Sequence, residues 1–210
     1  MVITYFGASY FKVQFGDTII AYNPISKDSK LSGSKFGADI VLTSLNHPDF
    51  NGVEQATLGA KMPFIIRTPG EYEIKNVFIK GFSSNSGYDG DPGRINTMYR
   101  LSLEGMNLCF LGALGNPKIP SESVEAFEDI DVLFVPIGGE GVLTPAEAYK
   151  LAVSIEPKLI IPMHYETIGV KNALEVFLKE SGTKVEAIDK LTLKKKDLDG
   201  KEGEIVVLSS

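Results

Sequence analysis

The sequence is poor in the residues that bind transition metals and form disulfides. Its 210 residues include two histidines, one cysteine and no tryptophan. A single cysteine excludes an intrachain disulfide. The two histidines, His47 and His164, are separated by a long stretch of chain without another. Because catalytic zinc usually takes three protein ligands, a chain with two imidazoles cannot form a histidine-rich metal centre by itself.

Basic residues and long apolar runs are also scarce. Lys and Arg number 21 against 27 Asp and Glu, for a formal net charge of -6. Nucleic-acid binding is therefore not expected, because it needs clustered basic side chains. The one basic run, 194–196, lies beside two aspartates and predicts a solvated hairpin turn. Without a bilayer-length apolar stretch or a secretory signal, we expect no membrane association and a cytoplasmic location.

The apolar residues that are present predict a layered α/β fold. A hydrophobic content of 43% allows a full core in one domain, residues 1–210. Alternating runs at 2–6, 10–15 and 18–22 predict an antiparallel meander with a turn at Gly16-Asp17. Helices are expected at 52–60, 121–128, 144–154 and 170–180, the third opened by a capping box of Thr144 and Glu147 with Pro145 between them. The pattern predicts two face-to-face sheets with helices outside, an αββα sandwich.

The sequence also predicts the structure of the tail, of a Gly- and Asp-rich segment and of the strand that contains the cysteine. The tail has strand-like runs at 185–188, 191–194 and 204–208, with a turn at Asp199-Gly200. The Gly- and Asp-rich segment 83–93 predicts a mobile loop. Cys109 lies in an apolar strand and is expected to be a buried, inert thiol.

The segment Asp39-Ile-Val-Leu-Thr-Ser-Leu-Asn-His-Pro-Asp-Phe50 is the most informative part of the chain. A β-branched run predicts a buried strand, and the turn after it carries His47 and Asp49. The segment resembles the strand and His-x-His-x-Asp-His loop of the metallo-β-lactamase fold superfamily. In that alignment Leu45 stands at the first His, His47 at the second, Asp49 at the Asp and Phe50 at the last His.

Other segments extend this resemblance to about Glu166 and are similar to the L-ascorbate-6-phosphate lactonase-like group of Zn-dependent hydrolases. Gly7-Ala8-Ser9 stands where a Gly-His-Ser turn is usual, and Asn23 precedes Pro24 where Asp is common. Segment 68–73 reads Thr-Pro-Gly-Glu-Tyr-Glu, close to the group's Gly-Pro-Gly-Glu-Tyr-Glu. A Gly-Asp-Leu-Gly-His pattern is matched with Ala113 at the Asp and Asn116 at the His, whereas His164 retains a ligand position.

The resemblance implies a site for two zinc ions, but most of the implied ligands are replaced. Such a site uses about five histidines and two aspartates from distant loops. One implied half-site keeps His47, and the other keeps Asp49 and His164. We therefore expect no tightly bound metal; the alternative is one zinc or manganese ion held by His47, Asp49 and His164. The loop edge is expected to form a rebuilt, uncharged pocket whose candidate residues are His47, Asp49, His164, Asn23, Leu45, Phe50, Ala113 and Asn116.

Three functions remain open at this point. A catalytically degenerate protein would bind a small molecule or a protein partner through this pocket or an exposed face. A hydrolase of the lactonase or phosphoester type would use a single weakly held metal to activate water. A regulatory subunit would assemble with an active relative, and self-association into a homo-oligomer is also open. A metal-free dyad, in which Asp49 accepts a hydrogen bond from His164, is a less favoured route to hydrolysis, with Ser44, Ser83 or Ser84 as the nearest candidate nucleophiles.

Overall fold

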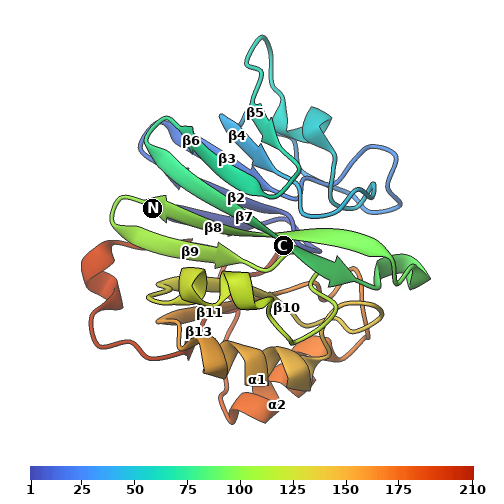
Figure 1. Cartoon of the computed structure of the whole chain (residues 1–210), viewed down its shortest axis with the longest axis vertical. Coiled ribbons are helices and arrows are strands. Elements are labelled where there is room, and N and C mark those ends of the chain that lie inside the picture. Colours follow the sequence, from blue (N-terminus) through green and yellow to red (C-terminus); the bar gives the residue numbers. More distant parts are fainter.

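Two β-sheets pack face to face, and the two α-helices cover the outer face of one of them (Figure 1). A computed structural model describes the backbone of residues 1–210 and the side chains of all of them except residue 122. One sheet has six strands in the order β12-β1-β2-β3-β4-β5, and the other has seven in the order β13-β11-β10-β9-β8-β7-β6. The predicted sandwich is confirmed.

The six-stranded sheet begins with the predicted meander. It contains β1 (Val2–Tyr5), β2 (Phe11–Phe15), β3 (Thr18–Tyr22), β4 (Ile40–Leu42), β5 (Phe64–Ile66) and β12 (Lys190–Thr192). Gly16 has a φ of 53°, the left-handed conformation that a tight turn between β2 and β3 needs. β3, β4 and β5 are mutually parallel, so their carboxyl ends meet at one edge of the sheet.

The seven-stranded sheet combines a long hairpin with a parallel half. Its strands are β6 (Gly70–Ile74), β7 (Val77–Ser86), β8 (Arg94–Leu103), β9 (Met106–Phe110), β10 (Val132–Pro136), β11 (Leu159–Met163) and β13 (Glu204–Ile205). All five residues of β10 are buried, as they are in β11. Such unbroken apolar runs are typical of parallel strands covered on both faces. β9, β10 and β11 run parallel, so their carboxyl ends also share one edge.

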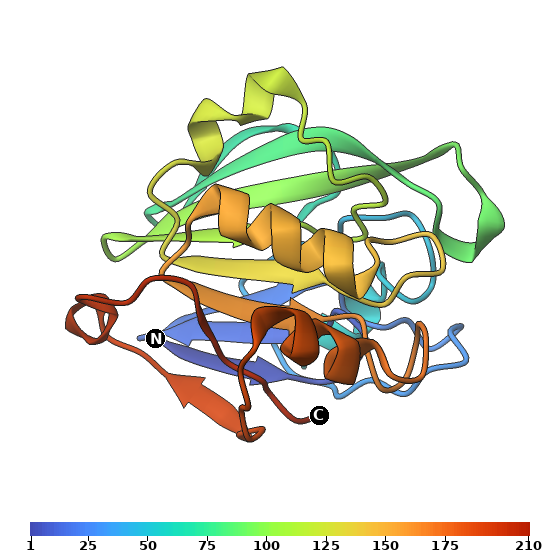
Figure 2. The same cartoon turned by 90° about the horizontal axis from the view of Figure 1, so that it is seen from below.

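The two α-helices lie side by side across β10 and β11 (Figure 2). α1 (Pro145–Ile155) begins at Thr144 with the predicted capping box to Glu147. α2 (Ala173–Ser181) ends at Gly182, whose φ of 69° suits a helix terminus. Among the described helices, none is long and apolar enough to cross a membrane.

The predicted helices at 52–60 and 121–128 are wrong. These segments form short 3-10 turns instead, at Val53–Ala56, Ser121–Ser123 and Glu125–Phe127. A short helix needs an apolar face packed on the core, and the first segment buries Ala56 alone and the last Phe127 alone. The outer face of the six-stranded sheet is accordingly covered by irregular segments, including Ile25 and Phe36.

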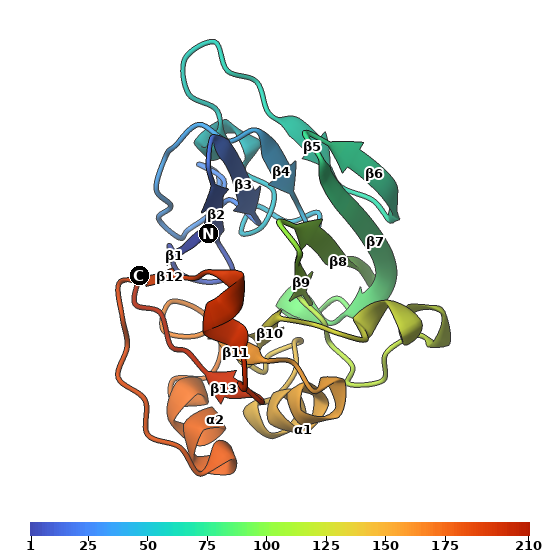
Figure 3. The same cartoon turned by 90° about the vertical axis from the view of Figure 1, so that its left-hand side faces the viewer.

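The tail was also predicted incorrectly in part. The run 185–188 is not a strand, and β12 and β13 join different sheets, so they form no hairpin around Asp199-Gly200. Figure 3 shows β12 beside β1, whereas β13 lies next to β11. The basic run opens a 3-10 helix, Lys195–Leu198, and Lys195 pairs with the buried Asp131 rather than with solvent alone. The local pattern predicted that the tail strands pair with each other. In the structure each one pairs instead with a strand distant in sequence.

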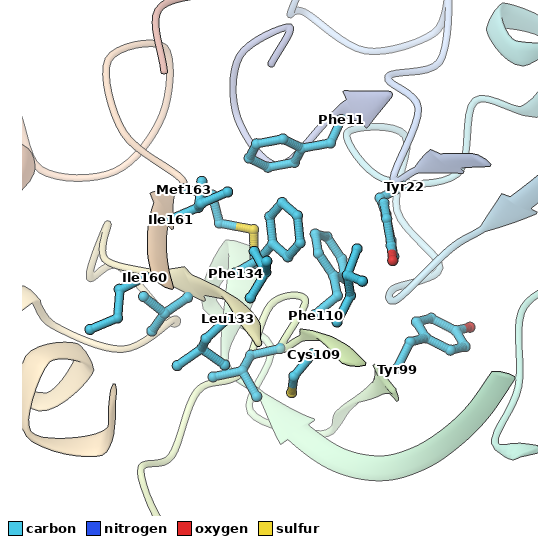
Figure 4. Packing of buried hydrophobic residues seen from close by; sticks show 14 of the residues in the cluster. Phe11, Tyr22, Tyr99, Cys109, Phe110, Leu133, Phe134, Ile160, Ile161 and Met163 are labelled. Carbon is cyan, nitrogen blue, oxygen red and sulfur yellow. The ribbon is translucent and has the colours of Figure 1, made fainter. Parts of the chain in front are cut away.

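Aromatic rings fill the space between the sheets (Figure 4). The rings of Phe11 and Phe134 meet edge to face with centroids 5.0 Å apart, and those of Tyr22 and Phe110 stack at 4.5 Å. Cys109 is buried in this core as expected, and burial raises the pKa of its thiol well above the usual range. Rings contributed by both sheets therefore fix how one sheet sits on the other.

A buried carboxylate ties the tail to the parallel strands. Asp131 accepts hydrogen bonds from Lys158 at 2.7 Å, Lys195 at 2.8 Å and the backbone N–H of Asn107 at 2.8 Å. Burial opposes its ionisation, but these hydrogen bonds outweigh burial and lower its pKa below the ordinary value. Its stabilising contribution is therefore present at neutral pH and is lost as pH falls through the lowered pKa.

We predict that Asp131→Asn lowers the free energy of unfolding at pH 7 by about 2 kcal/mol, because hydrogen bonds between charged groups are lost. Urea unfolding of the two proteins measures this difference. Asp129→Asn, at an exposed neighbouring position with a left-handed backbone that Asn tolerates, is the matched control. Equal losses in the two variants would contradict the assigned role of Asp131.

Candidate functional site: an aromatic cluster at the strand ends

The predicted site residues follow the carboxyl ends of strands in both sheets. Asn23 follows β3, the segment 43–50 follows β4, Ala113 comes shortly after β9, and His164 follows β11. In open α/β sheets, ligands bind at this end of the strands. The chain therefore brings together, at one edge, segments far apart in sequence.

Leu45, Phe50 and Ala113 pack against one another in an apolar cluster completed by Val142 and the partly buried Tyr88. Phe50 is fully buried, and its ring stacks near that of His164 with centroids 6.0 Å apart and an interplanar angle of 24°. These three side chains stand at positions where the alignment with the resembling family places ligands. At those positions the structure has hydrocarbon, not donor atoms.

Tyr88 completes the cluster, and no sequence signal pointed to it beyond its place in the Gly- and Asp-rich segment. β7 extends through that segment to Ser86, and residues 87–93 form the tip of the β7–β8 hairpin, at the right of Figure 1. The Tyr88 ring meets Phe50 edge to face at 4.9 Å and His164 at 5.4 Å. Its hydroxyl donates a 2.5 Å hydrogen bond to Asp49. The hairpin tip is thereby fixed over the strand ends.

His47 occupies the turn and contacts carboxylates through both ring nitrogens. Its Nδ1 accepts the backbone N–H of Asp49 at 3.2 Å and lies 3.4 Å from the Asp49 carboxylate. Its Nε2 lies 3.6 Å from the carboxylate of Asp89. The two nitrogens point in opposite directions on the ring, so the two carboxylates cannot share one ion with this imidazole.

His164 is fully buried, and neither of its ring nitrogens has a hydrogen-bond partner among the described atoms. The predicted hydrogen bond from His164 to Asp49 is therefore wrong; Asp49 instead accepts from Tyr88 and Ser29. Burial lowers the pKa of His164 to about 3, and the Asp49 carboxylate opposes that shift only in part. The imidazole is consequently neutral at physiological pH.

A buried polar network lies beneath this cluster. The amide of Asn23 donates to Ser44 at 2.8 Å and accepts the Ser44 backbone N–H at 2.7 Å. Asn96, a residue absent from the sequence-based candidates, accepts the backbone N–H of Ala113 at 2.7 Å and donates to Ser84 at 2.8 Å. The side-chain amides of Asn23 and Asn96 therefore stabilise the loops by these hydrogen bonds. The sequence signal that could have identified Asn96 is a polar amide within an otherwise strand-like run.

Asn116 differs from these buried residues. Its side chain is exposed and accepts a hydrogen bond from the backbone N–H of Lys118 in a local turn. Of the candidate serines, Ser44 and Ser84 are buried in the network and Ser83 is exposed. With the nitrogens of His164 unpartnered, no serine–histidine pair forms in the part of the chain that the structure describes.

The donor set does not fit a metal centre. No group of three or more His, Cys, Asp or Glu side chains able to hold an ion occurs among the described residues. Asp49 has its oxygens engaged by two hydroxyl donors, and the His164 ring is stacked near Phe50. Zinc needs about three protein ligands around one point. We therefore derive no reaction step through a metal here.

Among the hollows on the surface, two contain buried polar groups and differ in what lines them. One, of about 960 Å³, surrounds Asp131 and Lys195 at the opposite end of the seven-stranded sheet, and its buried carboxylate is already fully hydrogen-bonded. The other, of about 510 Å³, lies at the strand carboxyl ends and includes Tyr88 and His164 in its lining. The smaller of these two contains a buried imidazole without a hydrogen-bond partner, that of His164, and is the better site candidate.

We predict that Tyr88→Phe lowers the free energy of unfolding by about 1–2 kcal/mol, because Asp49 loses a buried donor while the ring packing is kept. Denaturant titration measures the change. Tyr149→Phe serves as the control, since that ring packs on Phe177 away from the strand ends. A loss in the control as large as in Tyr88→Phe would rule out the proposed fastening of the hairpin tip.

We predict that His164→Asn reduces the acid sensitivity of the fold. A depressed histidine pKa means that the unfolded chain binds the proton more readily, so stability falls as pH drops below about 6.5 toward 3. Between pH 7 and pH 5 the wild type should lose about 2 kcal/mol more than the variant. Asn tolerates the left-handed backbone of His164, whose φ is 66°. Parallel pH profiles for the two proteins would show that burial leaves this pKa unshifted.

Comparison with known proteins agrees with this architecture. Residues 2–164 match the family described as Beta-lactamase superfamily domain. A putative Zn-dependent hydrolase of the metallo-β-lactamase superfamily from Thermotoga maritima superposes with a TM-score of 0.75 at 31% identity, covering 99% of this chain and 97% of its own. A metal-dependent hydrolase of Salinibacter ruber is 23% identical over 194 residues, 80% of this chain and 85% of that protein. The chain belongs to the metallo-β-lactamase superfamily.

Proposed function

We propose that this protein is a non-hydrolytic member of its superfamily that binds a ligand at the carboxyl ends of its strands. The observation that carries the proposal is the packing of Leu45, Phe50 and Ala113 together at positions where the superfamily's motifs place metal ligands. Buried hydrocarbon cannot coordinate zinc, and it removes the negative charge that offsets a divalent ion. The pocket beside this cluster remains open to a small molecule.

A second candidate is a hydrolase of the lactonase or phosphoester type with one metal at His47, Asp49 and His164. Its support is that similar proteins are named metal-dependent hydrolases. The contacts weigh against it, because His47 faces two different carboxylates and Asp49 is held by Ser29 and Tyr88. Binding one ion would require breaking these contacts before any coordination energy is gained.

Metal analysis of protein purified without chelator separates the two candidates. We expect elemental mass spectrometry to find well below one zinc, manganese or iron ion per chain, because the described residues include no cluster of three metal-binding side chains. One stoichiometric ion together with ester hydrolysis that stops on chelation would overturn the non-hydrolytic proposal.

Restoring donors is the complementary test. We predict that Leu45→His, Phe50→His and Ala113→Asp, combined, raise zinc occupancy above the wild type without reaching two ions per chain, because other implied histidines remain absent. The matched control combines Leu45→Gln, Phe50→Gln and Ala113→Asn, which adds polarity with poor zinc ligands. Equal zinc contents in the two triple variants would contradict the assignment of these positions to a former metal centre.

A further inference from the structure

The pocket at the strand ends is formed by three loops that approach one another through glycine. Gly87 and Gly141 are in backbone contact, with the Gly87 N–H donating to the Gly141 carbonyl at 2.8 Å. A Cβ on Gly141 would lie 2.1 Å from the carbonyl oxygen of Gly87. The pocket beside this contact, about 510 Å³, is lined by the hairpin tip, the 140–141 turn, His164 and the 168–169 turn. Its volume is suited to a small organic molecule.

The imidazole of His164 is the unsatisfied group of this pocket. His164 is one of the residues that line the cavity; its side chain is fully buried, and neither Nδ1 nor Nε2 has a partner among the described residues. A buried polar group without a hydrogen bond costs about 1–3 kcal/mol, so a group left in this state in a native fold calls for a ligand or water. As a neutral ring, it offers one acceptor nitrogen to an N–H or O–H donor.

Of the residues expected to form an uncharged pocket, His164 alone lines this one, and the charge around it is negative. Asp89 and Glu140 line it, and among the described lining residues none is Lys or Arg. Arg94, 3.5 Å from Asp89, offsets one of the carboxylates. Glu140 is exposed and takes part in no ion pair within the described part of the chain. Asp49, beneath Tyr88, adds a further negative charge, so an anionic ligand would be repelled.

We propose that this pocket binds a small organic amine in its protonated form. The inference rests on the proposed non-hydrolytic function and names the ligand class. The ammonium group would donate hydrogen bonds to the acceptor nitrogen of His164 and to the carboxylate of Glu140. The ring of Tyr88, which lines the same pocket, supplies an aromatic surface that attracts cations. Phosphorylated and carboxylated molecules lack the required charge.

The test is calorimetric titration of the metal-free protein with three probes of similar size: benzylamine, benzyl alcohol and benzoate. Benzylamine, protonated at neutral pH, is expected to bind at least about tenfold more tightly than benzyl alcohol, and benzoate more weakly than either. Glu140→Gln should weaken benzylamine binding by about fivefold to tenfold and leave benzyl alcohol binding unchanged. His164→Asn should weaken both of these probes, because each one donates to the imidazole.

Glu104→Gln is the matched control, because Glu104 is also exposed with a φ of 51° but lies at the opposite end of β8 from the hairpin tip. It should bind all three probes like the wild type. Absence of benzylamine binding, equal affinity for the three probes, or an equal loss in Glu104→Gln would overturn the amine assignment. Those results would leave the non-hydrolytic proposal standing, since that proposal fails on stoichiometric metal and chelator-sensitive turnover.

Discussion

The stacking of Phe50 against His164 is the contact on which the strand-end architecture depends. It joins the loop after β4 in one sheet to the end of β11 in the other. Tyr88 closes over both rings from the β7–β8 hairpin, so three segments distant in sequence share one aromatic cluster. Dispersion and apolar burial link these segments.

The buried ionisable groups of the fold differ in whether they have a partner. Asp39 and Asp131 are buried, but each is met by two lysines: Lys61 and Lys75 for the first, and Lys158 and Lys195 for the second. His164 has no such partner among the described residues and stays neutral. A buried ion without compensation costs more than the fold can supply, so the imidazole retains a hydrogen-bonding function in place of a charge.

Backbone geometry at the strand ends is unusual. Ala8, Asn23 and His164 all have left-handed φ values, 53°, 45° and 66°, and the His164 N–H donates to the Ala8 carbonyl at 2.5 Å. For a residue such as alanine this conformation costs about 1 kcal/mol or more, and it persists only where surrounding contacts enforce it. The buried Asn23–Ser44 hydrogen bonds supply such contacts. Hydrogen bonds therefore hold the backbone of this edge in its left-handed conformations.

The sequence by itself determined the sandwich, the capped start of α1, the buried thiol and the shortage of metal donors, because periodicity, capping residues and composition are local properties of the chain. The helices predicted at 52–60 and 121–128 do not form, because these segments bury too few apolar residues to stabilise a helix on the core. The tertiary structure alone decided that Tyr88 and Ser29, rather than His164, hold Asp49, and that β12 and β13 join different sheets. These outcomes depend on contacts between residues far apart in sequence, and a local sequence pattern does not predict such contacts.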